Sequence, residues 1–158
     1  PVPVDQLGIL DDMVSALQQA GALGTSDSLL YAFGVHINTE LPALDSKTLV
    51  PYLQAYCVSQ YWLMKAHDVD TLRRLTPYID TYPKKYIHEV MTYTADTPLE
   101  QIMDDYLEYN PTRNRGMDLL PLFKQIDEAR VLAAVQDERV NARPTFHYRL
   151  PKIGRAHV

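Results

Sequence analysis

Two short segments near the ends of this 158-residue chain alternate between apolar residues and polar or small ones. They are residues 31–38 and residues 143–150. Alternate side chains of a strand point to opposite faces, so the pattern predicts two strands that each have one apolar face. The apolar positions are Tyr31, Phe33, Val35 and Ile37 in the first segment, and Phe146, Tyr148 and Leu150 in the second.

The rest of the chain has the apolar spacing of helices, with steps of three and four residues. Ser46 is the expected cap of the second helix, Thr97 with Glu100 forms a capping box, and Asp118 is the expected cap of the last helix. These patterns predict an α+β fold in which most of the chain is helical and packs on a partial antiparallel sheet. The expected helices are 5–20, 48–67, 70–78, 84–91, 98–109 and 118–139.

Composition narrows the class of protein. The formal net charge is −5, so the chain lacks the basic surface expected of a protein that binds nucleic acid or an anionic membrane. No apolar run is as long as a membrane span. Cys57 is the only cysteine, which rules out an internal disulfide and fits a reducing, cytoplasmic compartment. The length is enough for one domain with its own core.

Both ends of the sequence look like boundaries of a fragment. The chain starts at Pro1 without an initiator Met, and residues 153–158 back-translate to a common sequencing-adapter oligonucleotide. We therefore expect a partial catalytic domain over residues 1–151 and a tail of foreign origin over residues 152–158.

The first predicted strand carries an unusual polar face. His36, Asn38 and Glu40 are two residues apart and so share one side of the strand, opposite Val35 and Ile37. An imidazole, an amide and a carboxylate together can bind a metal or a polar substrate. A single histidine on a strand more often has a structural role, so the pattern alone leaves both interpretations open.

The second predicted strand carries a cationic face. Arg143, Thr145, His147 and Arg149 share one side. Arginine suits phosphate because its planar group donates two parallel hydrogen bonds. This strand is therefore a candidate anion-binding site.

A third candidate is the loop that precedes the last predicted helix. It contains Arg113, Asn114 and Arg115, close to a helix N-terminus that would itself favour an anion. The loop could hold a phosphate or a substrate carboxylate. Alternatively, Asp118 is only a helix cap and Arg115 is its ion-pair partner.

At these segments the chain resembles the putative amidoligase family, a branch of the carboxylate–amine ligases related to glutamine synthetase and glutamate–cysteine ligase. The resemblance extends over roughly residues 7–151. The matching pieces run from Tyr31 to Glu40, from Asp105 to Arg115, from Leu119 to Phe123 and from Ala142 to Pro151.

The resemblance implies a glutamine-synthetase-like catalytic sheet that holds ATP and Mg²⁺. A carboxylate takes the γ-phosphoryl group to give an acyl phosphate, and an amine then displaces the phosphate to form an amide or peptide bond. Small-molecule or peptide carboxylates and amines would be the substrates. By this analogy the catalytic residues are His36, Asn38, Glu40 and His147, the metal ligands are Glu40 and His147, and the groups that bind phosphate or carboxylate are Arg113, Asn114, Arg115, Arg143 and Arg149.

The chain also departs from its relatives. They carry an acidic strand with alternating carboxylates for Mg²⁺, and this sequence has no Glu-x-Glu strand. We therefore expect the 158-residue chain to be inactive by itself. Two alternatives remain: a metal-dependent hydrolase that uses His36, Glu40 and His147 as ligands, and a non-catalytic helical domain that binds a partner through an exposed apolar patch.

Overall fold

The computed structural model describes residues 2–21, 36–67 and 79–150. The chain divides into two compact units, one formed by residues 1–35 with 152–158 and the other by residues 36–151. In the first unit, a 3₁₀ turn, η1 (Val4–Gln6), precedes the helix α1 (Ile9–Gln19). The helix predicted over residues 5–20 is therefore confirmed from Ile9 onward. Gly21 follows with a φ of 77°, a conformation that suits glycine at the end of a helix.

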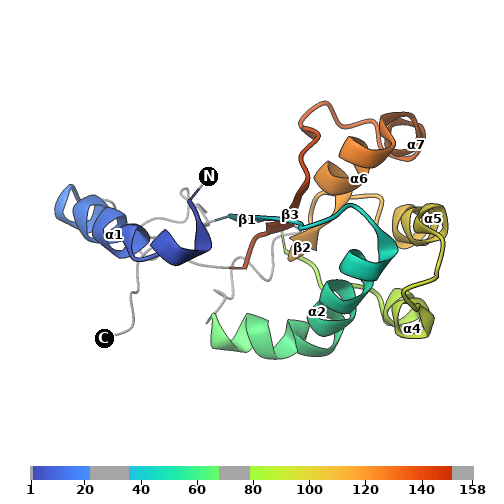
Figure 1. The fold of residues 1–158 in the computed structure, drawn as a ribbon, viewed down its shortest axis with the longest axis horizontal. Coiled ribbons are helices and arrows are strands. Elements are labelled where there is room, and N and C mark those ends of the chain that lie inside the picture. The colour runs from blue at the N-terminus through green and yellow to red at the C-terminus, as the bar shows by residue number, and fades with distance from the viewer. Residues whose placement is uncertain (1, 22–35, 68–78, 151–158) are drawn as a thin grey trace. The chain divides into compact units, whose positions relative to one another are not determined.

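The second unit is an α+β fold, as the sequence predicted (Figure 1). Its three strands form one antiparallel sheet in the order β1-β3-β2. The strands are β1 (Ile37–Glu40), β2 (Met117–Asp118) and β3 (Thr145–Tyr148). The helices are α2 (Ser46–Ala66), α4 (Lys84–Thr92), α5 (Leu99–Tyr109), α6 (Leu120–Ile126) and α7 (Glu128–Ala134).

Both predicted strands have a counterpart in the sheet, with different limits. β3 lies inside the predicted segment 143–150, and Pro144 directly precedes it, where a missing N–H costs no ladder bond. β1 begins at Ile37 and continues to Glu40, beyond the predicted end at residue 38. Residues 31–35 of that prediction lie outside the described residues, as do the predicted helix 70–78 and the tail 152–158.

Helix α2 has a different cap from the predicted one. Asp45, not Ser46, is the N-cap, and its Oδ1 accepts a hydrogen bond of 2.8 Å from the N–H of Thr48. Pro51 is the sixth residue of the helix. The predicted capping box at Thr97 does not form either, because α5 begins at Leu99 and the Thr97 hydroxyl instead accepts from the N–H of Thr94.

The single helix predicted over residues 118–139 was also wrong. Asp118 belongs to β2, and the helical part is divided into α6 and α7. Asp127 marks the break: its backbone leaves the helical conformation, and its side chain accepts a hydrogen bond of 3.0 Å from the N–H of Arg130. A residue that can cap a new helix thus interrupted a continuous apolar pattern.

One face of the sheet packs on α2. The ring centroids of Tyr52 and Phe146 are 5.3 Å apart, and those of Tyr56 and Tyr148 are 6.4 Å apart. A core of buried side chains continues from this contact through the other helices, and much of it is aromatic. Its fully buried large members include Tyr82, Tyr86, Tyr106, Phe123, Leu49, Leu53, Ile102, Met103, Leu119, Leu120, Leu122 and Leu150. Within the described ranges, no helix has the length and apolar character needed to cross a membrane.

Candidate functional site

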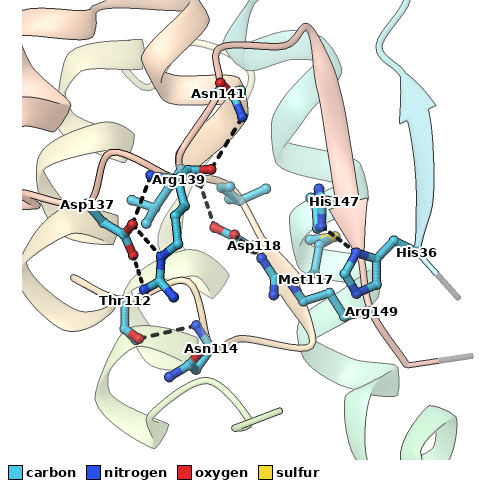
Figure 2. A network of polar contacts seen from close by, with 12 residues as sticks. His36, Thr112, Asn114, Met117, Asp118, Asp137, Arg139, Asn141, His147 and Arg149 are labelled. Carbon is cyan, nitrogen blue, oxygen red and sulfur yellow. Dashed lines mark hydrogen bonds and ion pairs between the residues drawn. The ribbon is translucent and has the colours of Figure 1, made fainter. Parts of the chain in front are cut away.

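The strand register brings the two predicted polar faces onto one side of the sheet. Asn38 of β1 lies opposite His147 of β3, and Glu40 lies opposite Thr145. Residues directly opposite each other in an antiparallel pair share a face. His36 joins them from just before β1, because its Nδ1 lies 3.1 Å from Nε2 of His147 (Figure 2). The apolar partners Phe146 and Tyr148 point the other way, toward α2.

The third strand adds an acidic residue that sequence reasoning did not place in the site. Asp118 of β2 also lies opposite His147, and its side chain is fully buried. Its Oδ2 forms an ion pair of 2.9 Å with Nη2 of Arg149, while its Oδ1 accepts from the N–H of Leu120. The predicted partner of Asp118 was Arg115, so that alternative was wrong. A two-residue strand is too short to leave an alternating pattern, and the sequence therefore gave no signal for it.

A pocket of about 480 Å³ opens next to Arg149. Its wall is formed by the loop before β2, the segment after α7, and Arg149 itself (Figure 2). The volume is within the range of small-molecule sites. Three predicted site residues line it, namely Arg113, Asn114 and Arg149. Arg139 and Asp137 line it too, and sequence analysis did not identify either of them.

The pocket is rich in guanidinium groups. Arg113, Arg139 and Arg149 contribute to its wall, against the single carboxylate of Asp137. Asp137 is paired with Arg139 at 2.8 Å, and this contact holds the pKa of the Asp137 carboxyl far below its usual value. Arg149 is paired with Asp118 in the same way, so the three arginines exceed the two carboxylates by one charge, and the pocket favours an anionic ligand.

Other predicted site residues lie elsewhere. Arg115 donates to the backbone carbonyls of Thr81, at 2.8 Å, and Tyr109, at 3.2 Å, so its guanidinium ties the loop to neighbouring segments. Arg143 is exposed at the start of the β3 segment, where its N–H donates to the carbonyl of Pro121. His36, Asn38, Glu40 and His147 share the polar face of the sheet with Arg149 and are not part of the pocket wall.

The polar face is electropositive around His147. Burial lowers the pKa of the His147 imidazole to about 4, with further contributions from Arg149, His36, Arg143 and Arg113. The imidazole is therefore neutral at pH 7. Burial has the opposite effect on Asp118, since it raises the pKa of that carboxyl to about 6 even though Arg149 acts to lower it.

The described residues do not form a metal centre. In the ranges that the structure describes, no group of three or more His, Cys, Asp or Glu side chains is placed so that it could hold a metal ion. Glu40 and His147, the predicted ligands, share a sheet face but do not belong to such a group in the described ranges. The same holds for the combination of His36, Glu40 and His147 that the hydrolase alternative requires.

The alternative of a helical interaction domain predicts an exposed apolar patch together with polar strand faces that do not converge. Helix α2 does expose Val58, Tyr61 and Trp62, with exposed fractions of 73%, 58% and 66%. The polar faces, however, do lie on one side of the sheet. The second observation favours a binding site over a purely apolar docking domain.

Comparison with protein families gives one match. Over residues 1–153 the sequence matches the profile of a family described as "Putative amidoligase enzyme". Comparison with curated proteins and comparison with solved structures each found no match.

Proposed function

Because the chain belongs to the putative amidoligase enzyme family, we propose that it carries part of the site of an ATP-dependent carboxylate–amine ligase. The reaction would form an amide or peptide bond between a small-molecule or peptide carboxylate and an amine, through an acyl phosphate. The observation that carries this proposal is the pocket lined by Arg113, Arg139 and Arg149, next to the polar face of the sheet.

Phosphoryl transfer requires little covalent chemistry from the protein. Its rate depends mainly on the alignment of the phosphate and on neutralisation of its charge, which arginines supply. In our proposal Arg149 contacts the phosphates of ATP from the pocket wall, and Arg143 reaches them from the exposed start of the β3 segment. Arg113 and Asn114 hold the substrate carboxylate or a phosphate at the other side of the pocket. Arg115 is less suited to bind the substrate, because its guanidinium already bonds to two backbone carbonyls.

The imidazole pair would serve the amine. A neutral imidazole can accept a hydrogen bond from an attacking amine. His36 would take this role, because Nδ1 of His147 is buried and its Nε2 faces His36, and His147 itself is neutral at pH 7 because burial and nearby arginines lower its pKa. His36, 3.1 Å away, is placed to exchange a proton with it. Asn38 and Glu40 extend the same face toward the amine substrate.

Mg²⁺ is also part of the proposal, with Glu40 and His147 as its expected ligands. Since these two side chains belong to no group of three or more that could hold a metal ion among the described residues, no step above depends on the metal. Because the sequence has no Glu-x-Glu strand to hold Mg²⁺, we expect the 158-residue chain to bind ATP without turning it over. Robust Mg²⁺-dependent ATP hydrolysis by the purified chain would contradict this expectation.

The test has two parts. Calorimetric titration of the chain with ATP should show binding that Arg149→Gln weakens and Arg130→Gln does not, because Arg130 is paired with Asp104 and Asp127 and does not line the pocket. Absence of ATP binding would overturn the assignment of the pocket. The ligase reaction itself is tested on the complete open reading frame, with hydroxylamine as the amine. Formation of a hydroxamate should require both ATP and a carboxylate, and ATP-independent formation would refute the acyl phosphate.

A further inference from the structure

Asp118 is a carboxylate near the pocket whose two oxygens both bond to other groups of the protein. It is fully buried, and both of its oxygens are bonded: Oδ2 to Nη2 of Arg149 at 2.9 Å, and Oδ1 to the N–H of Leu120 at 3.0 Å. The second bond fixes the carboxylate to the first residue of α6. Because this bond ties the carboxylate to the backbone of α6, it also fixes where the carboxylate meets the guanidinium of Arg149.

Arg149 is fixed by the same segment at its other end. Its backbone N–H donates to the carbonyl of Gly116 at 2.8 Å, two residues before Asp118. Its side chain is only 12% exposed and yet forms part of the pocket wall. The segment Gly116–Asp118 thus anchors both the backbone and the guanidinium of Arg149 beside the pocket. Figure 2 shows the side chains of Asp118 and Arg149 next to each other.

Stability alone does not explain this ion pair. Removing a carboxylate from water is costly, and a buried ion pair is often no more stable than an apolar pair of similar volume. The raised pKa of Asp118 agrees, since burial outweighs the attraction of Arg149. The pair does, however, restrict a flexible side chain to one direction, and an arginine that is already oriented loses less entropy when it binds an oxyanion.

We propose that Asp118 is a positioning residue, which holds the guanidinium of Arg149 so that it donates to an oxyanion, a phosphate or a carboxylate, bound in the adjacent pocket. The inference rests on the proposed function of that pocket. It adds a residue that the polar-face pattern did not contain, and it assigns Asp118 no contact with the ligand.

The direction in which one substitution changes the affinity for anions tests the proposal. Asp118→Asn keeps the size of the side chain and removes a negative charge beside a cationic pocket. If Asp118 acted only through its charge, the variant would bind anions more tightly. If it positions Arg149, the variant should bind about tenfold more weakly, the loss expected for one charge-assisted hydrogen bond. Asp104→Asn, which removes the same charge from an exposed site on α5, is the matched control and should leave binding unchanged.

The probes are inorganic pyrophosphate and, in parallel, succinate, both titrated by calorimetry into the folded 158-residue chain. Whichever of them binds identifies the pocket as a phosphate site or a carboxylate site. Weaker binding of that probe to Asp118→Asn supports the proposal. Unchanged or tighter binding to the variant overturns it, and so does failure of the wild-type chain to bind either probe.

A second measurement does not need a ligand. In ¹⁵N-edited NMR spectra, a fixed Arg149 guanidinium should give slowly rotating Nη signals, and these should broaden or collapse in Asp118→Asn while the backbone spectrum stays dispersed. Equal Arg149 signals in both proteins would contradict a positioning role. If hydroxamate formation fails and both of these effects are seen, the ligase proposal falls and the role of Asp118 stands.

Discussion

His36 Nδ1 and His147 Nε2 lie 3.1 Å apart, although the two residues are 111 positions apart in the chain. One nitrogen must donate and the other accept, so the contact requires that the two facing nitrogens are not both protonated. This contact joins the start of the first strand to the middle of the last. Because the contact depends on which nitrogens are protonated, titration of His147 reports on the state of the site.

We predict that His147 titrates well below an ordinary histidine, with a pKa of about 4. NMR titration of its ring proton signals checks this value. Because Arg149 contributes to the shift, Arg149→Gln should raise the pKa of His147, though burial should still keep it below that of an exposed histidine. Arg130→Gln is the control, since Arg130 is not among the groups that lower this pKa.

The same shift has a consequence for stability. The folded-state pKa of His147 lies below the unfolded value of about 6.5, so the unfolded chain binds more protons between these two pH values. The contribution of His147 is complete above about pH 6.5 and is lost as the pH falls toward about 4. His147→Gln should therefore flatten the decline of the melting temperature in this window. An equal slope in wild type and variant would contradict the assigned pKa.

We predict opposite phenotypes for two arginines of one loop. Arg115 bonds to the carbonyls of Thr81 and Tyr109, so Arg115→Gln should lower the free energy of unfolding by about 2 kcal/mol. Arg113 lines the pocket, so Arg113→Gln should weaken pyrophosphate or succinate binding with little change in stability. Urea denaturation and calorimetry of both variants make the comparison. Loss of stability in Arg113→Gln alone would reverse these roles.

Gly116 should not tolerate a larger side chain. A Cβ at this position would overlap the hydroxyl of Tyr56 and lie 3.0 Å from Cδ2 of Leu150. Overpacking of this kind costs about 1–3 kcal/mol, so Gly116→Ala should lower the unfolding free energy by that amount. Adding Tyr56→Phe should recover part of the loss, because it removes the overlapped oxygen. Gly8→Ala, where no atom lies within 4 Å of the new Cβ, is the control.

We predict that Asp45, and not Ser46, stabilises the start of α2 through its side chain. Asp45→Ala should lower the melting temperature more than Ser46→Ala, because only Asp45 accepts from the N–H of Thr48. This hydrogen bond also lowers the pKa of the Asp45 carboxyl, so its contribution is present above the ordinary pKa and is lost as the pH falls. The difference between wild type and Asp45→Ala should therefore shrink in acid. A larger effect of Ser46→Ala at neutral pH would restore the cap first expected.

Local sequence patterns predicted which residues share a face of each of two strands but not the third strand. Alternation separated His147 from Phe146, and it separated His36 and Asn38 from Ile37, because the two-residue repeat of a strand is a local property. β2 contains only Met117 and Asp118, too few residues for a repeat. β2 pairs with β3 only through contacts distant in sequence. Local patterns could not reveal this pairing, and Asp118 was therefore interpreted as a helix cap.

Local patterns also predicted the helices better than the residues at which they begin and end. The apolar spacing predicted most of α4 and all of α5, since each has a regular buried face. It could not choose between Asp45 and Ser46 as a cap, because both side chains are suited to that position. Nor did it reveal the break at Asp127, where the apolar pattern continues across two helices.

The sequence by itself determined the α+β class, the polar and apolar faces of two strands, and the residues that resemble the amidoligase family, because these depend on local repeats and on residue identity. Only the tertiary structure decided that the polar faces meet at His36 and His147, that Arg149 rather than Arg115 is linked to Asp118, and that Arg113, Arg139 and Arg149 share one pocket. Register and pocket walls arise from packing between segments far apart in the chain, and no local pattern encodes which of several arginines reaches a given carboxylate.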